Sequence, residues 1–191
     1  MDILVSGSMA YDRIMDFEGK FSEHILPDQL DNINVSFTVN SLTENFGGTA
    51  GNIAYSLSLL GEKPRILATI GQDYHRYFEW LERIGVPTGD IRVVEEELTA
   101  GAYITSDTQN NQITGFNPGA MKQQSGFDFE TVDSKACLAI VAPGNLGDMA
   151  DYTAEHEKRG IYSIFDPGQS LPAWEKSALA KVIGQSRMLV C

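Results

Sequence analysis

Short apolar runs that alternate with segments of helical periodicity constrain the fold of this chain more than any other feature. The apolar runs have the length of buried strands and occupy residues 3–8, 65–71, 91–94, 138–142 and 161–165. Segments with helical spacing of apolar side chains separate or follow them, at 52–60, 74–84, 148–159 and 174–183. Buried strands that alternate with helices are typical of a parallel sheet covered on both faces. The sequence therefore predicts a doubly wound α/β fold.

A glycine-rich stretch at 45–52 precedes the first of these helices. Gly47, Gly48 and Gly51 lack the side chains that would keep a ligand away from the backbone. Asn52 is expected to open the helix and to place its carboxamide at the junction. The stretch has neither the Gly-Lys-Ser/Thr ending of a phosphate loop nor the spacing of the dinucleotide fingerprint. A carboxamide beside bare backbone suits a neutral, hydroxyl-bearing ligand such as a sugar; a tight loop-to-helix turn without a ligand is the alternative.

A second, smaller sheet is predicted from segments that alternate between apolar and polar residues. Residues 33–39 carry apolar side chains at odd positions and polar ones at even positions, and 13–17 alternate similarly. Residues 100–106 and 112–116 flank a polar turn and predict a hairpin. Such alternation belongs to an antiparallel sheet with one wet face. Ser36 is then on the polar face, toward solvent or a ligand.

Two side chains outside the glycine-rich stretch are candidate ligand contacts. Asp12 follows the first buried strand, at the sheet edge where open α/β folds bind ligands. Its carboxylate can accept two hydroxyl hydrogens from a vicinal diol, although an aspartate that forms a turn explains the position as well. Phe116 precedes Asn-Pro-Gly and either packs on a ligand ring or only stabilises the turn.

Composition and charge exclude several classes of protein. At 191 residues the chain suits one compact domain or slightly more. A formal net charge of -12 disfavours nucleic acid and anionic membranes as partners. The N-terminus lacks the features of a signal peptide, and no stretch approaches the length of a membrane span, so we expect a cytoplasmic protein. The two cysteines and three histidines are scattered, which predicts neither a disulfide framework nor a metal site.

The end of the sequence carries a further expectation. Cys191 closes an apolar run that begins at Met188. A strand placed there lacks the crossover that normally follows a strand in a parallel sheet. We therefore expect this sequence to be the N-terminal part of a longer chain.

Several of these motifs, taken in order, resemble the PfkB/ribokinase family, and within it the bacterial adenosine-kinase-like members. The resemblance spans essentially the whole chain and is carried by Gly7-Ser8 with Asp12, and by the segments 19–23, 46–52, 70–73, 116–121, 142–145 and 166–169. It implies a ribokinase-like doubly wound α/β domain with a mainly parallel sheet, helices on both faces and a small β-sheet lid. Residues 1–191 would form the N-terminal part of one such domain, with lid strands from about 10–18, 33–46 and 98–118.

The resemblance also implies an activity and a set of contacts. The family transfers the γ-phosphoryl group of ATP, which is accompanied by Mg²⁺, to the primary hydroxyl of a sugar or nucleoside, and an adenosine-like acceptor is the first expectation here. The positions that match contacts to the acceptor's sugar are Asp12, Gly47, Gly48 and Asn52. The positions that match contacts to its base are Ser8, Ser36 and Gln169, and Phe116 matches a lid aromatic that covers the ligand. The lid strands imply a homodimer, since exposed strand edges invite pairing.

The sequence departs from the family pattern in three respects. The family's catalytic aspartate, in a Gly-x-Gly-Asp helix N-terminus, would lie beyond residue 191, so no catalytic residue is assigned and we expect the segment alone to be inactive. Ala102 stands where nucleoside-using relatives tend to carry an aromatic residue, and Ser170 stands where they carry a second glutamine. These two changes leave room for another nucleoside or a plain sugar. The alternative function is a non-catalytic small-molecule-binding or dimerisation module derived from the same fold.

Overall fold

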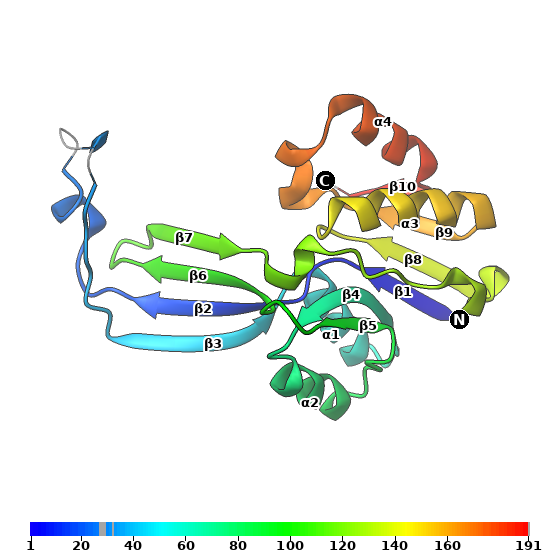
Figure 1. Cartoon of the computed structure of the whole chain (residues 1–191), viewed down its shortest axis with the longest axis horizontal. Helices are drawn as coiled ribbons and strands as arrows, with labels where there is room; N and C mark the ends of the chain where they lie inside the picture. Colours follow the sequence, from blue (N-terminus) through cyan, green and yellow to red (C-terminus); the bar gives the residue numbers. More distant parts are fainter. Residues whose placement is uncertain (27–29, 32, 191) are drawn as a thin grey trace.

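The computed structural model describes residues 1–26, 30–31 and 33–190, which form a helix-covered body and a projecting sheet (Figure 1). The body is built on a six-stranded sheet in the order β10-β9-β8-β1-β4-β5, and its paired strands run parallel. Its strands are β1 (Asp2–Ser6), β4 (Arg65–Gly71), β5 (Ile91–Val94), β8 (Cys137–Val141), β9 (Tyr162–Phe165) and β10 (Met188–Leu189). The apolar run at the end of the chain thus forms β10, whereas Cys191 lies outside the described residues.

Helices cover both faces of this sheet because side chains along each strand point alternately to its two sides. The helices are α1 (Thr49–Leu59), α2 (His75–Arg83), α3 (Leu146–Arg159) and α4 (Lys176–Gln185). In β1, Ile3 and Val5 pack with residues of α1 and α2, whereas Leu4 packs in a second cluster with Tyr152 of α3. Figure 1 shows α4 beside α3 on that second face. The doubly wound fold predicted from the sequence is therefore confirmed.

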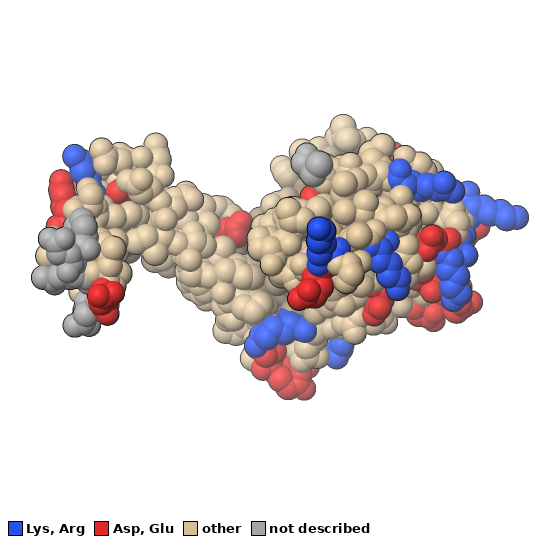
Figure 2. Space-filling model, turned by 90° about the horizontal axis from the view of Figure 1, so that it is seen from above, with Lys and Arg blue, Asp and Glu red and all other residues tan. Residues whose placement is uncertain are grey.

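The projecting sheet, here called the lid, has four strands in the order β3-β2-β6-β7. They are β2 (Ala10–Asp16), β3 (Ser41–Gly47), β6 (Ala100–Ser106) and β7 (Gln112–Asn117). The hairpin predicted for the last two is confirmed, and its strands pair antiparallel. However, β2 runs parallel to β6, so the lid is a mixed sheet and not the purely antiparallel one that we expected. Few charged side chains mark the lid in the face shown in Figure 2.

The strand predicted for residues 33–39 is wrong, because these residues pair with neither sheet and the lid strand is β3 instead. The alternation itself is real, since the odd-numbered residues from 35 to 39 are half-buried and the even-numbered ones are exposed. Phe37 packs on Phe17 and Phe21, with ring centroids 4.8 and 5.1 Å away. A cluster of aromatic rings at the tip of the lid thus partly buries these apolar side chains, although the segment is not hydrogen-bonded into a sheet.

The first helix begins earlier than the sequence suggested. Asn52 does not open α1, because Thr49 is its first residue and Gly48, with φ of 87°, is its N-cap. Asn52 lies one turn inside the helix, and its N–H donates to the Gly48 carbonyl (2.9 Å). The glycine-rich stretch therefore divides into the end of β3, a one-residue turn and the first turn of α1.

No helix in the described part of the chain has the length and apolar character needed to cross a membrane. The cytoplasmic location expected from the sequence stays a prediction.

Candidate functional site

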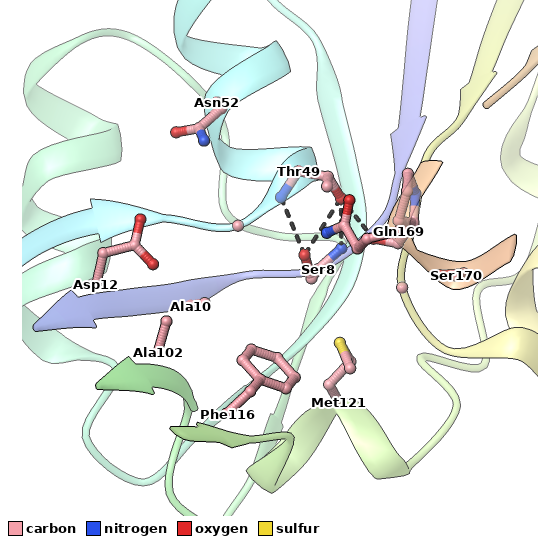
Figure 3. Close-up of a pocket in the computed structure, with 13 residues that line it drawn as sticks. Ser8, Ala10, Asp12, Thr49, Asn52, Ala102, Phe116, Met121, Gln169 and Ser170 are labelled. Atoms are coloured by element: carbon pink, nitrogen blue, oxygen red, sulfur yellow. Dashed lines mark hydrogen bonds between the residues drawn. The ribbon is translucent and has the colours of Figure 1, made fainter. Parts of the chain in front are cut away.

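A cavity of about 560 Å³ opens between the lid and the carboxyl ends of the body strands (Figure 3). Its walls come from segments far apart in the sequence. The residues that line it are Ser8, Ala10, Asp12, Gly48, Thr49, Asn52, Ala102, Phe116, Met121, Pro143, Gly144, Gln169 and Ser170. Its volume lies in the range of about 300–1,000 Å³ that is typical of small-molecule sites.

One end of the cavity carries an aspartate and an asparagine from different elements. Asp12 lies in the middle of the lid, where β2 places it opposite Asn45 of β3 and Ala102 of β6. Asn52 comes from the first turns of α1, and its carboxamide and the Asp12 carboxylate face the same space (Figure 3). Burial raises the pKa of Asp12. Within the described residues no N–H or O–H group donates to this carboxylate, so its oxygens are available to a ligand.

The other end of the cavity is apolar and carries one amide. Phe116 of β7 and Met121 of the short 3-10 helix Gly119–Lys122 form one wall (Figure 3). Gln169 and Ser170 belong to a second 3-10 helix, Gly168–Ala173, that follows β9. Phe116 lines the cavity and is 52% exposed, so about half of its surface is open to a ligand or to solvent.

Six of the eight residues proposed from the sequence line this cavity: Ser8, Asp12, Gly48, Asn52, Phe116 and Gln169. Gly47 does not, although it lies directly behind Asp12 and a Cβ built on it would be 2.2 Å from Asp12 Oδ2. Ser36 is exposed and lies in the segment next to the tip cluster, outside the lining residues. The contacts expected for Gly47 and Ser36 stay predictions.

Several lining residues were not expected from the sequence to contact a ligand. Thr49 belongs to the glycine-rich stretch itself, and Pro143 and Gly144 belong to a segment that carries the family resemblance. Ala102 and Ser170, where the family resemblance implies other residues, both lie in the wall of the cavity. Met121 follows the Asn-Pro-Gly turn after β7, and only the bend of the chain at that turn brings it to Phe116.

The described residues contain no group of three or more His, Cys, Asp or Glu side chains arranged to hold a metal ion. We therefore assign no Mg²⁺ ligand to this segment.

A six-stranded parallel sheet covered on both faces, with a mixed β lid that encloses a cavity at the strand ends, defines the ribokinase-like class of α/β proteins. The profile of the pfkB family carbohydrate kinases matches residues 2–191. The chain belongs to this family.

Relatives within the family are nucleoside kinases. The chain is 29% identical over 158 residues to the nucleoside kinase of Methanocaldococcus jannaschii. The aligned region covers 82% of this chain and 51% of that protein. It is 27% identical over 186 residues to the nucleoside kinase of Methanothermobacter thermautotrophicus. Here the aligned region covers 96% of this chain and 57% of that protein. The chain therefore spans about half the length of the curated relatives that it matches.

Solved structures agree with this assignment. Burkholderia thailandensis nucleoside kinase in complex with inosine superimposes with a TM-score of 0.82 and 41% identity, covering 98% of this chain and 59% of that one. The nucleoside kinase of Methanocaldococcus jannaschii, described as an archaeal member of the ribokinase family, gives a TM-score of 0.78 and 26% identity, covering 99% and 60%.

Proposed function

We propose that this chain forms the acceptor-binding part of an ATP-dependent kinase that phosphorylates the primary hydroxyl of a nucleoside. The observation that carries the proposal is the Asp12 carboxylate, which has no hydrogen-bond partner among the described residues and shares one end of the cavity with Asn52, while the walls at the other end are apolar. A ribose diol donates two hydroxyl hydrogens, and a carboxylate accepts both. The names of the relatives support the same class of acceptor.

The residues of this segment bind and orient the acceptor. Asp12 fixes the ribose by its secondary hydroxyls, and the bare backbone at Gly48 permits close approach of the sugar. Phe116 covers the base with an aromatic face. Phosphoryl transfer depends mainly on positioning of the reactants and on electrostatic stabilisation of the phosphoryl group. This segment contributes the positioning of the acceptor. We place the ATP contacts and the general base outside it, and the expected inactivity of the segment alone stays a prediction.

We propose that the base end of the cavity accepts a purine, without a strict choice of purine. Gln169 presents an amide that both donates and accepts hydrogen bonds, so it can pair with a 6-amino or a 6-oxo group. Ala102 and Ser170 are small, so they leave space in the cavity where larger side chains would restrict the range of acceptors that fit. Adenosine is the acceptor first expected from the sequence, and inosine is the ligand named for the Burkholderia structure.

The test is a kinase assay of the full-length protein with ATP-Mg²⁺ and adenosine, inosine, uridine or ribose. We expect kcat/KM to be highest for a purine nucleoside. Asp12→Asn should raise the acceptor KM about tenfold, because removal of one charged partner of a hydrogen bond costs about 1–3 kcal/mol, and the ATP KM should not change. Failure to phosphorylate any of these acceptors, or unchanged acceptor kinetics in Asp12→Asn, contradicts the proposal.

A second role, dimerisation, is favoured by the side of the lid that faces away from the cavity. The strand register places Leu42, Tyr103 and Ile113 together on that side, opposite to Asp12 and Phe116. These three side chains are 65%, 41% and 44% exposed. We propose that a second copy of the chain covers them, because apolar side chains that share one face mark an association surface.

A further inference from the structure

Three segments of the body meet at the floor of the cavity. Ser8 follows β1, Thr49 begins α1, and Pro143 follows β8, and all three line the cavity (Figure 3). The contact is close, since a Cβ built on Gly7 would lie 2.5 Å from Thr49 Oγ1 and one built on Gly144 would lie 2.8 Å from the Gly7 carbonyl carbon. Hydrogen bonds through two hydroxyl groups join the three segments.

The positions of the two hydroxyl hydrogens follow from their partners. Thr49 Oγ1 lies 2.5 Å from the Pro143 carbonyl oxygen, which can only accept, so the Thr49 hydroxyl donates there. Ser8 Oγ lies 3.2 Å from Thr49 Oγ1 and must therefore donate its own hydrogen to that oxygen. The Ser8 N–H is shared between Thr49 Oγ1 and the Pro143 carbonyl oxygen, each at 3.0 Å. In this arrangement the Ser8 hydroxyl hydrogen points at Thr49 Oγ1 and not into the cavity.

Ser8 also caps α1 from outside the helix. Helices need acceptors for their first N–H groups, and a side chain at the N-cap normally provides one. Gly48 occupies the N-cap and has no side chain. Instead, the Thr49 N–H donates to Ser8 Oγ and the Ala50 N–H donates to the Ser8 carbonyl oxygen, each at 2.9 Å. The start of α1, which carries Gly48 and Asn52 into the cavity, is thereby fixed to β1.

We propose that Thr49 is a positioning residue for the acceptor and that Ser8 acts as the cap of α1 and not as a reader of the base. The ends of β1 and β8 are joined directly by the bond from the Ser8 N–H to the Pro143 carbonyl oxygen, and the Thr49 hydroxyl, which receives two bonds from Ser8 and gives one to Pro143, attaches the start of α1 to both. This inference rests on the proposed function, because the acceptor whose position is at stake is the nucleoside.

The first experiment compares Thr49→Val and Thr49→Ser in the full-length protein. Valine keeps the shape and removes the hydroxyl, so we expect the acceptor KM to rise about tenfold with the ATP KM unchanged, as for a lost buried hydrogen-bonding partner. Serine keeps the hydroxyl and should restore acceptor kinetics to near those of the wild type. If Thr49→Ser is as impaired as Thr49→Val, the hydroxyl has no positioning role.

Thr153→Val is the matched control for a purely structural loss. Thr153 is completely buried in α3, and its Oγ1 donates to the Met149 carbonyl oxygen at 2.7 Å, away from the cavity. Urea unfolding reports the loss of stability in each variant, and only Thr49→Val should change the acceptor KM. Equal changes of acceptor KM in the two variants would mean that the effect is structural, and the inference would fail.

The second experiment asks whether Ser8 reads the base. Ser8→Ala is assayed with adenosine, inosine and uridine, and a cap predicts that KM rises by the same factor for all three. A factor that differs several-fold between the bases would show that Ser8 contacts the base and would overturn the inference. Asp12→Asn separates the two proposals. If it leaves acceptor kinetics unchanged, the proposed function itself fails; if it impairs them while Thr49→Val does not, only the positioning role fails.

Discussion

Gly47 acts on the candidate site through Asp12, although it does not line the cavity. A methyl group at Gly47 would lie 2.2 Å from Asp12 Oδ2, far inside van der Waals contact, and the backbone there is held by a hydrogen bond from Tyr77 Oη to the Gly47 carbonyl (2.7 Å). Gly47→Ala must therefore displace the carboxylate. We expect the acceptor KM of the full-length protein to rise about tenfold, on the scale of a lost charged hydrogen bond, without a change in the ATP KM.

A matched control for Gly47→Ala is Gly115→Ala in β7, where an added Cβ meets no atom within 4 Å. That variant should keep acceptor kinetics close to those of the wild type. If Gly47→Ala also leaves the acceptor kinetics unchanged, the added methyl group does not move the Asp12 carboxylate out of its binding position.

Single residues also show how much of the site could be predicted from the sequence. Asp12 and Asn52 were recognisable because their chemical groups suit a diol and because they adjoin a strand end and a glycine-rich stretch. The hydrogen bonds between Ser8 and Thr49 could not be predicted, since they join residues 41 positions apart. The sequence placed the start of the helix at Asn52 because the apolar side chains with helical spacing begin just after it.

Elements were predicted well where burial alone decides them. Strands β1, β4 and β8 are covered on both faces, so an apolar run is sufficient to identify them. The strand predicted for residues 33–39 was wrong because alternation indicates which side chains are half-buried but not which part of the protein covers them. At the tip of the lid the cover is the aromatic cluster around Phe37, which includes an edge-on contact with His24 (ring centroids 5.7 Å apart).

Helix α3 contains a buried histidine that makes acid stability testable. His156 is 1% exposed, packs edge-on against Phe129, and neither ring nitrogen has a hydrogen-bond partner in the described structure. Burial lowers its pKa to about 4 from 6.5, and the nearby Glu155 only partly opposes this. The unfolded chain therefore binds a proton at His156 below pH 6.5 while the folded protein does not. This contribution to stability is complete above that pH and is lost as the pH falls toward 4.

The size of the effect follows from the shift in pKa. At about 1.4 kcal/mol per unit, the loss of unfolding free energy between pH 7 and 4 approaches about 3 kcal/mol. Urea unfolding of the wild type and of His156→Leu at both pH values measures it, because the other titrating groups, including Asp148, whose pKa burial raises, are common to both proteins. Equal pH dependence in the two proteins would show that His156 is protonated in the fold or reaches solvent.

At the scale of the whole molecule, the lid has two faces of different character. The inner face carries Asp12 and Phe116 into the cavity, and the outer face carries Leu42, Tyr103 and Ile113. If a second copy covers the outer face, dimerisation also holds the lid over the acceptor. A charge introduced on that face should then separate the subunits and weaken acceptor binding together.

Leu42→Glu tests this coupling, and Leu59→Glu is its control. Leu42 lies on the outer face of the lid and is 65% exposed, while Leu59 lies at the end of α1 on the body and is 69% exposed, so neither substitution disturbs a core. Sedimentation equilibrium of the full-length protein should give a dimer for the wild type and Leu59→Glu and a monomer for Leu42→Glu. The acceptor KM should rise only in the monomer, because a lid without its partner is less firmly held. A monomeric wild type, or a Leu42→Glu variant that stays dimeric, excludes association through this face of the lid.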